Sequence, residues 1–348
     1  MKPTEVETDG GETNPDGAAP FETVASERMD RRERYTLFFK EWVVAPLLVI
    51  REDWRALVGG AIILFYALMG TVGVWLIDEP TVGEGDRLLR PFEDMAHPLG
   101  TDLNGNDLLA QTVHATPPML EMIVAGALFT TVVATAVGTL SGYKGGKTDR
   151  LLMTFTDILL TIPGLPLVIV LALVLNPRQP WIVGIILTIN AWAGLARAIR
   201  SQVLTIREES FIEASRLMGI PTWKIVLKDV TPGLMPYVLV NFVNSARTVI
   251  FASVGLYFLG ILPDTFLNWG VMMNYAYSLG GALYTSGTAH WLFVPLITIV
   301  ILSFGLILFA QGTDRIFNPR VRARHTSGPA SEDSGEEQSG DVATQIRS

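Results

Sequence analysis

The sequence predicts an all-α integral membrane protein with six transmembrane helices and both termini in the cytoplasm. Hydrophobic residues make up 49% of the chain and charged residues only 17%, against roughly 25% charged residues in ordinary soluble domains. The apolar residues gather into six runs near the roughly 20 residues that a helix needs to cross a bilayer core about 30 Å thick. Basic residues gather in the segments that this topology places on the cytoplasmic side.

Each predicted span is a long apolar run bounded by polar or charged segments. The six runs cover residues 54–77, 119–140, 154–175, 180–196, 236–260 and 291–311. A shorter apolar run, 42–50, is too short to span. It lies within the basic segment 31–53, which is typical of an amphipathic segment at the membrane interface.

The distribution of lysine and arginine predicts the orientation. Segments 141–153 and 198–235 are basic, as are the stretches before the first span and after the last one, whereas residues 262–290 contain no lysine or arginine. Cytoplasmic loops carry the excess of basic residues. We therefore expect a multi-pass protein of the cell membrane with both termini inside.

The chain divides into a membrane core and two polar ends. Residues 1–30 are acidic and poor in large apolar side chains, and residues 312–348 are first basic and then acidic. Such segments bury too little surface to offset the entropy of ordering, so the acidic parts are predicted to be disordered. The first span and its external loop take residues 54–118, and the core takes residues 119–311.

Composition also excludes several classes of site. The chain has no cysteine and four scattered histidines, so we expect no thiolate nucleophile and no metal site. No nucleic-acid partner is expected. No cleavable signal peptide is expected either, since the acidic start lacks a basic region followed by an apolar one.

The stretch SGYKGGKTD at residues 141–149 imitates the end of a phosphate-binding loop. A P-loop needs a glycine five positions before Gly146, where Ser141 stands, and it must follow a buried strand, whereas this stretch follows an apolar span. We therefore expect a tight turn between two spans, and no nucleotide site on this chain.

The segment 207–236 carries the strongest functional signal. Phe211, Ala214, Ser215 and Met218 have the i, i+3, i+4, i+7 spacing of one helix face. Gly219 ends this predicted helix, and the proline two positions later prevents it from continuing. A short helix of this kind is suited to docking into another protein.

Several motifs in this order resemble the permease subunits of ABC importers of the dipeptide, oligopeptide and nickel family. The resemblance covers roughly residues 45–322 and includes the EAA signature of the cytoplasmic loop. The matching stretches are Glu213-Ala214-Ser215 with Gly219 and Val230-Thr231-Pro232, His97-Pro98-Leu99-Gly100-Thr101-Asp102, Asp149-Arg150-Leu151-Leu152-Met153, Phe258-Leu259-Gly260 and Asn318-Pro319-Arg320.

The resemblance implies a type I ABC importer permease that docks on separate ATPases. It implies two ATPase subunits that hold ATP and magnesium, a second and related permease, an extracytoplasmic binding protein, and no cofactor or enzymatic activity on this chain. Peptides are the implied cargo, and nickel chelates or oligosaccharides are the alternatives. The implied coupling residues are Phe211, Glu213, Ala214, Ser215, Leu217, Met218, Gly219 and Pro232.

Polar groups inside the predicted spans are candidates for the translocation path, because such groups usually face a cavity or a partner. They are Arg247, Asn244, Asn241 and Asn190. For Arg247 two interpretations stay open: contact with a substrate carboxylate, or an interhelical pair with Glu121 or Asp157. Pro163-Gly164 is expected to kink the third span and act as a hinge.

Two other classes of protein compete with the importer hypothesis. An ion-driven secondary transporter would show inverted repeats and broken helices with intramembrane acids, and no such symmetry is visible here. A membrane scaffold would leave the segment 207–236 without a purpose. Co-purification of an ATPase distinguishes the first hypothesis from both.

Overall fold

The computed structural model describes residues 53–316, and their regular elements are all helical apart from one isolated bridge between Thr101 and Asp107. The expectations for residues 1–30, for the interfacial segment before Asp53 and for the tail after Ile316 lie outside the described residues. Four helices in the described range are long and apolar enough to cross a membrane, or six if each of two bent helix pairs counts as one span. The all-helical class is therefore confirmed.

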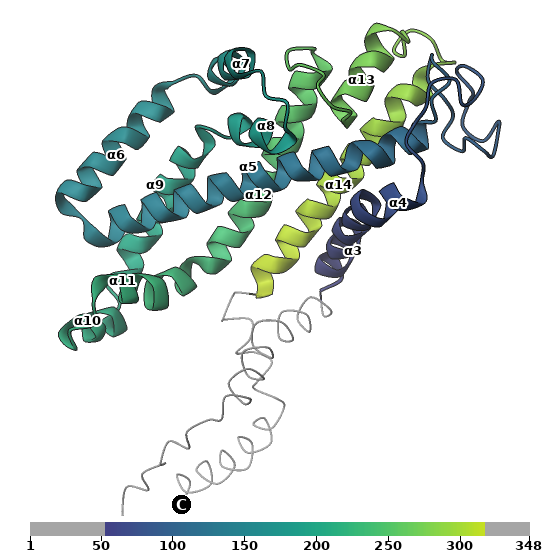
Figure 1. Cartoon of the computed structure of the whole chain (residues 1–348). Helices are drawn as coiled ribbons and strands as arrows, with labels where there is room; N and C mark the ends of the chain where they lie inside the picture. The colour runs from purple at the N-terminus through teal and green to yellow at the C-terminus, as the bar shows by residue number, and fades with distance from the viewer. Residues whose placement is uncertain (1–52, 317–348) are drawn as a thin grey trace, which may run out of the picture. The chain divides into compact units, whose positions relative to one another are not determined.

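The first and last candidate spans pack against each other. The first comprises α3 (Trp54–Leu68), the π-helix η2 (Met69–Gly73) and α4 (Val74–Leu76), and it lies beside α14 (Ala289–Ile316) (Figure 1). Their backbones touch: a Cβ atom at Gly59 would lie 2.4 Å from the Phe309 nitrogen. Such close approach through glycine is typical of helix pairs in membranes.

The central element is α5 (Leu108–Lys144), a helix of 37 residues that contains the predicted span 119–140. The Asp107 carboxylate caps its first turn by accepting hydrogen bonds from the Leu109 and Ala110 nitrogens, at 3.0 and 3.4 Å. At its other end, Gly145 and Gly146 have φ angles of 64° and 58°, and α6 begins at once. The turn between the two helices is therefore made at Gly145, and the rest of the stretch 141–149 is helical.

The third and fourth predicted spans are each broken. α6 (Gly146–Thr161) and α7 (Gly164–Leu175) meet at 85°, whereas the sequence analysis predicted only a kink. Pro163 cannot donate a backbone hydrogen bond and Gly164 costs little to bend, so the chain turns there. α8 (Pro180–Leu187) and α9 (Ala191–Ile206) meet at 58°, a break that was not predicted.

Ion pairs hold α6 against α9. Arg200 Nε and Nη2 donate to the two carboxylate oxygens of Asp149 at 2.6 and 2.5 Å, and Arg197 pairs with Asp157. One interpretation of Arg247 had been a pair with Asp157. That pairing is wrong, because Asp157 pairs with Arg197 of α9 instead.

The chain then forms the short helices that follow α9. α10 (Ser210–Leu217) is followed by α11 (Thr222–Ile225), the π-helix η3 (Val226–Val230) and α12 (Thr231–Phe258). The last three form one candidate span that starts well before the predicted boundary at residue 236. The predicted external loop 262–290 contains a further helix, α13 (Trp269–Ser278), that the sequence analysis missed.

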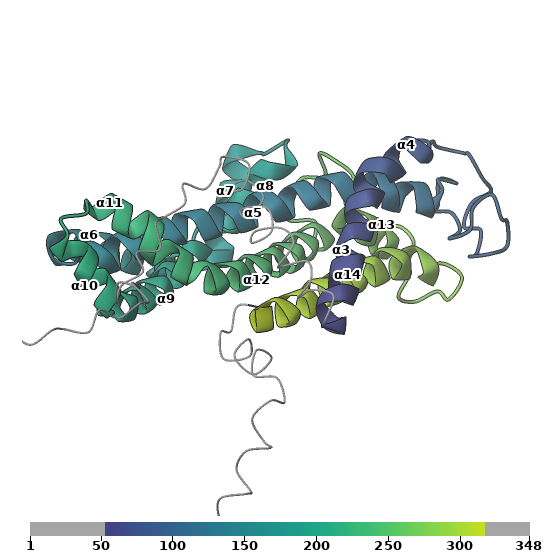
Figure 2. The same cartoon turned by 90° about the horizontal axis from the view of Figure 1, so that it is seen from below.

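The two ends of α5 carry different structures. α10 and α11 lie at the end where Tyr143 stands, and Arg216 of α10 donates to the Tyr143 hydroxyl at 3.2 Å (Figures 1 and 2). α13 and the segment 77–107 lie at the opposite end, where Trp269 Nε1 donates to the Thr112 carbonyl at 3.3 Å. The core correspondingly forms two clusters, one at each end of α5.

Candidate functional site

The candidate site is built on a helix hairpin after α9. α10 ends at a glycine turn in which Gly219 has a φ of 73° and the Ile220 nitrogen donates to the Ser215 carbonyl at 3.2 Å. No atom would lie within 4 Å of a Cβ at Gly219, so a side chain would have room there. Glycine is required because of the positive φ angle at this position. The chain then passes Pro221 and enters α11.

The side of α10 that packs on the core only partly overlaps the face defined by the spacing of Phe211, Ala214, Ser215 and Met218. Ile212 is fully buried and Ser215 is 8% exposed, whereas Phe211, Ala214 and Met218 point away from the core. Ile212 packs in the cluster that contains Tyr143 and Val230, and the Ser215 hydroxyl donates to Asp229 at 3.3 Å. Residues of the following π-helix therefore determine which side of α10 is covered, and the spacing within α10 alone did not show this.

The exposed side of α10 and its C-terminal end carries three large apolar side chains beside charged ones. Phe211, Leu217 and Met218 are 51%, 84% and 71% exposed. The sequence analysis missed Trp223 of α11, which is 61% exposed and carries the Lys224 ammonium over its ring. The other predicted coupling residues, Glu213, Ala214 and Pro232, are also exposed, and Pro232 stands in the first turn of α12.

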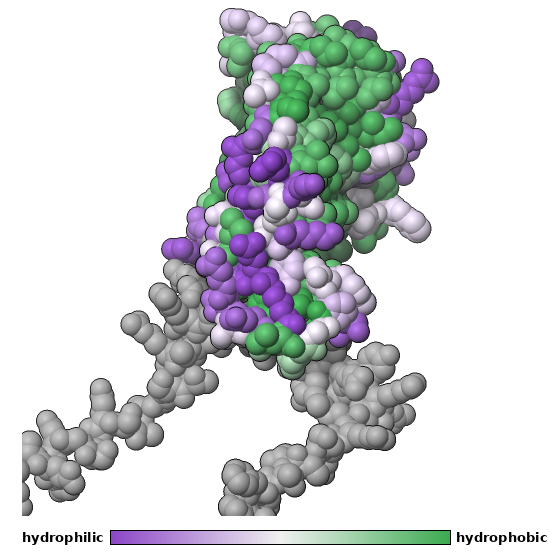
Figure 3. All heavy atoms as spheres, turned by 90° about the vertical axis from the view of Figure 1, so that its left-hand side faces the viewer, coloured by the Kyte–Doolittle hydropathy of each residue, from purple (hydrophilic) through white to green (hydrophobic). Residues whose placement is uncertain are grey.

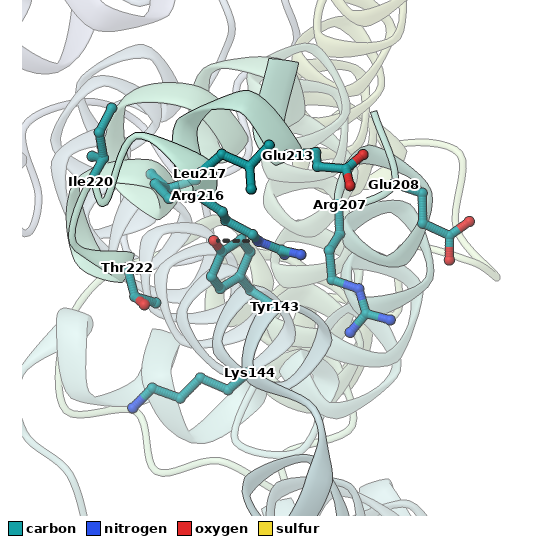
Figure 4. Close-up of a pocket in the computed structure, with 10 residues that line it drawn as sticks. Tyr143, Lys144, Arg207, Glu208, Glu213, Arg216, Leu217, Ile220 and Thr222 are labelled. Carbon is teal, nitrogen blue, oxygen red and sulfur yellow. Dashed lines mark hydrogen bonds between the residues drawn. The ribbon is translucent and has the colours of Figure 1, made fainter. Parts of the chain in front are cut away.

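A cavity of about 1020 Å³ opens beside α10 (Figure 4). Arg216 stacks over the Tyr143 ring at 5.0 Å and Glu213 lies at the rim. The charged side chains that line the cavity are three basic and two acidic ones: Lys144, Arg207, Arg216, Glu208 and Glu213. Tyr143, Lys144 and Arg207 come from the ends of α5 and α9, and the sequence analysis did not connect them with this site.

The surface beside this cavity has two characters. Figure 3 shows a broad hydrophobic area toward the top of the view and hydrophilic side chains gathered below it. On α6 and α7, the apolar side chains of Leu151, Leu165 and Val174 are all more than 60% exposed. Lipid is the solvent that suits such a face, whereas α10 lies among the hydrophilic groups.

The predicted path residues lie apart from α10. Asn241 and Asn244 line a small cavity of about 190 Å³ between α5, α9 and α12. Asn190 lies beside Gly164 of the predicted hinge. A Cβ at Gly164 would be 3.0 Å from Asn190 Nδ2. Arg247 does not line that cavity, and its buried Nε has no hydrogen-bond partner within the described residues.

Within residues 53–316, no group of three or more histidine, aspartate or glutamate side chains is arranged to hold a metal ion. Some of the acidic groups among these residues have a structural role. Asp102, for example, accepts hydrogen bonds from the Asn104 and Asn106 nitrogens and from Gln111 Nε2, at 2.7, 3.0 and 2.9 Å.

Comparison with known proteins assigns the family. The chain is 30% identical over 293 residues to the dipeptide transport system permease protein DppC of Bacillus subtilis, covering 80% of this chain and 89% of that protein. It is 29% identical over 306 residues to the oligopeptide transport system permease protein OppC of the same organism, covering 87% and 97%. OppC of Mycobacterium bovis is 32% identical over 237 residues, covering 65% and 77%.

A family match covers more than half of the chain. Residues 134–323 match the family described as binding-protein-dependent transport system inner membrane component. The matched range contains the broken helices and α10 to α13. The chain belongs to the family of binding-protein-dependent transport system inner membrane components.

Proposed function

We propose that this chain is a membrane-spanning permease subunit of an ABC importer that moves di- or oligopeptides across the cell membrane. The named relatives are permease proteins of dipeptide and oligopeptide transport systems, and the similarity extends over most of each chain. The chain itself has no catalytic role in this proposal. ATP and magnesium are held by separate ATPase subunits.

The proposed topology has six spans, with each bent pair counted as one span and both termini in the cytoplasm. The distribution of basic residues supports this orientation. The antiparallel arrangement of α3 and α14 supports it further, since a Cβ at Gly312 would lie 2.4 Å from the Ala56 Cβ. The start of the first span and the end of the last one are therefore on the same side.

The exposed apolar face of α10 is the observation that carries the coupling role. Three large apolar side chains, each more than half exposed, project from α10 and its C-cap residue Met218 among charged groups. The described part of the chain leaves them exposed beside charged groups, so a protein groove is their expected environment. Phe211, Leu217 and Met218 fill that groove on the ATPase, and Glu213 accepts hydrogen bonds there.

The remaining partners complete the pathway. A second permease supplies the other wall of the path, and an extracytoplasmic binding protein delivers the cargo. On this chain Asn241, Asn244, Arg247 and Asn190 face the path, and Pro163-Gly164 acts as the hinge that changes the angle between α6 and α7.

Purification of the tagged chain with its co-expressed transport partners tests the coupling role. Wild type is compared with Glu213→Arg and with Glu79→Arg, an exposed glutamate before α5 and far from α10 in sequence. The measurements are the polypeptides that co-purify in mild detergent and the ATP hydrolysis rate of the purified material. We expect Glu213→Arg to lose the ATPases but keep the second permease, and Glu79→Arg to behave as wild type.

The absence of an ATPase from well-folded wild-type material would contradict the importer proposal and favour an ion-driven transporter. Uptake of trialanine by vesicles that contain the whole assembly tests the cargo. Uptake of a nickel chelate or an oligosaccharide in place of trialanine would replace the peptide class and leave the coupling role intact.

A further inference from the structure

α12 carries a row of neutral polar side chains along one face. Asn241, Asn244, Ser245 and Thr248 have the i, i+3, i+4, i+7 spacing, and Asn244 and Thr248 are exposed. The helix is nevertheless part of a candidate membrane span, Thr222–Phe258. Because polar groups at this depth are costly against lipid and face a cavity or a partner instead, this face of α12 is turned away from the hydrocarbon.

The same four residues form one wall of the cavity of about 190 Å³. The opposite wall is Thr130 of α5 together with Thr188, Ala191 and Leu195 at the break between α8 and α9. None of the lining residues is ionisable. Helix breaks at membrane depth occur where the backbone is buried in protein or lines a cavity, and in secondary transporters substrate sites are typically formed beside such breaks.

Thr130 gives an independent reason to expect a ligand there. Its side chain is 2% exposed, and its Oγ1 is buried without a hydrogen-bond partner in the described part of the chain. Thr188 in the same cavity is satisfied, since its hydroxyl donates to the Gly184 carbonyl at 3.0 Å. A buried hydroxyl without a partner costs free energy, so the Thr130 hydroxyl is suited to receive a polar group that enters the cavity.

The lining determines the chemistry of that group. Hydroxyl and amide side chains both donate and accept hydrogen bonds, which matches the N–H and C=O of a peptide bond. A charged end would find no counter-charge in this cavity and would be disfavoured. The cavity is also smaller than the roughly 300–1,000 Å³ that enclose a drug-sized ligand, so it admits a segment of a chain and not a whole peptide.

We propose that this cavity is a subsite for the uncharged main chain of the cargo peptide, with Thr130 and Asn244 as the groups that bind one peptide bond. The inference rests on the proposed peptide importer function and deepens it. Because the subsite contacts groups that every peptide shares, it binds peptides with different side chains equally well.

The absence of cysteine from the chain makes a direct test possible. Ser245→Cys places one thiol in the cavity, and its reaction with a water-soluble maleimide is followed by mass spectrometry of this chain. The preparation is the whole importer with its binding protein, with and without trialanine. We expect trialanine to slow the reaction about twofold at a concentration equal to its dissociation constant at this site.

Two further variants in this background identify the hydroxyl that binds. Thr130→Val removes the unpartnered hydroxyl of the cavity. Thr131→Val removes a neighbouring hydroxyl that is also buried and unpartnered within the described residues but lines a different cavity, of about 470 Å³. We expect Thr130→Val to raise the trialanine concentration needed for protection about fivefold, as for one lost hydrogen bond, and Thr131→Val to leave it unchanged.

The possible results separate this inference from the proposed function. If the preparation imports trialanine but the introduced cysteine reacts equally fast with and without it, the importer stands and the subsite is wrong. Equal effects of Thr130→Val and Thr131→Val also overturn the subsite. If trialanine is neither imported nor protective while another cargo is imported, the peptide function itself fails.

Discussion

The contact between α5 and α8 leaves no room for a methyl group, which gives a sharp prediction for Gly184→Ala. A Cβ at Gly184 would lie 2.2 Å from the Met122 carbonyl oxygen, and a Cβ at Gly126 on the other helix would lie 2.6 Å from the Gly184 carbonyl oxygen. The two backbones therefore touch just before the break at Thr188, whose hydroxyl also reaches the Gly126 carbonyl at 3.3 Å.

The cost follows from the overlap. Ordinary contact begins near 3.4 Å, so 3.4 − 2.2 = 1.2 Å of separation must be found between two backbones. Neither can yield as a flexible side chain does, and we expect a net loss of about 1–3 kcal/mol in the free energy of unfolding. The gain in helix propensity from glycine to alanine, at most about 1 kcal/mol, offsets only part of that cost.

Gly194→Ala is the matched control, because a Cβ at Gly194 in α9 would meet nothing within 4 Å. This variant should be stabilised by about 0.5–1 kcal/mol. The purified proteins are unfolded in the same detergent while tryptophan fluorescence is monitored, which gives the order of their stabilities. We expect Gly194→Ala above wild type and Gly184→Ala below it. Equal midpoints for the two variants would refute the close contact between α5 and α8.

Three further predictions concern other parts of the chain. Leu217→Ser should weaken ATPase binding tenfold or more, since burying a leucine contributes about 1.5–3 kcal/mol; thermal unfolding should not change, because Leu217 is 84% exposed. Burial raises the pKa of the Asp107 carboxyl, so the native state binds its proton more tightly, and the free energy of unfolding should fall as pH rises from about 3.8 toward the raised pKa; Asp107→Asn should flatten this part of the pH profile. Asp149→Arg and Arg200→Asp should each destabilise the protein by about 1–2 kcal/mol, and a double variant without recovery would contradict the ion pair.

The apolar runs located the membrane helices but not their full extent. The predicted span 119–140 is only the apolar part of α5, because hydropathy detects the residues that meet hydrocarbon. The first three turns of α5 include polar residues such as Gln111 and Thr112, both buried by neighbouring protein. The contact that covers Thr112 comes from Trp269, far along the chain, so no local window of sequence contains it.

The position of the candidate coupling helix was predictable, and its orientation was not. The glycine and proline after Met218 locate the end of α10 because their effect on the backbone is local. The choice of buried face depends on Ile212 and on Asp229, which lies 14 residues beyond Ser215. Periodicity fits both faces of so short a helix, and only the tertiary contact decides between them.

Within the described residues, Arg247 forms no ion pair with Asp157, one of the two acidic residues suggested for it. Asp157 pairs with Arg197 between α6 and α9, and Glu121 is exposed. The Arg247 Nε is thus buried without a partner in the described residues, a costly state for an arginine in a span. We therefore expect its counter-charge to come from the second permease or from a cargo carboxylate. Arg247→Met should lower either permease pairing, measured by co-purification, or trialanine uptake. A variant with both unchanged would show that Arg247 needs no such partner.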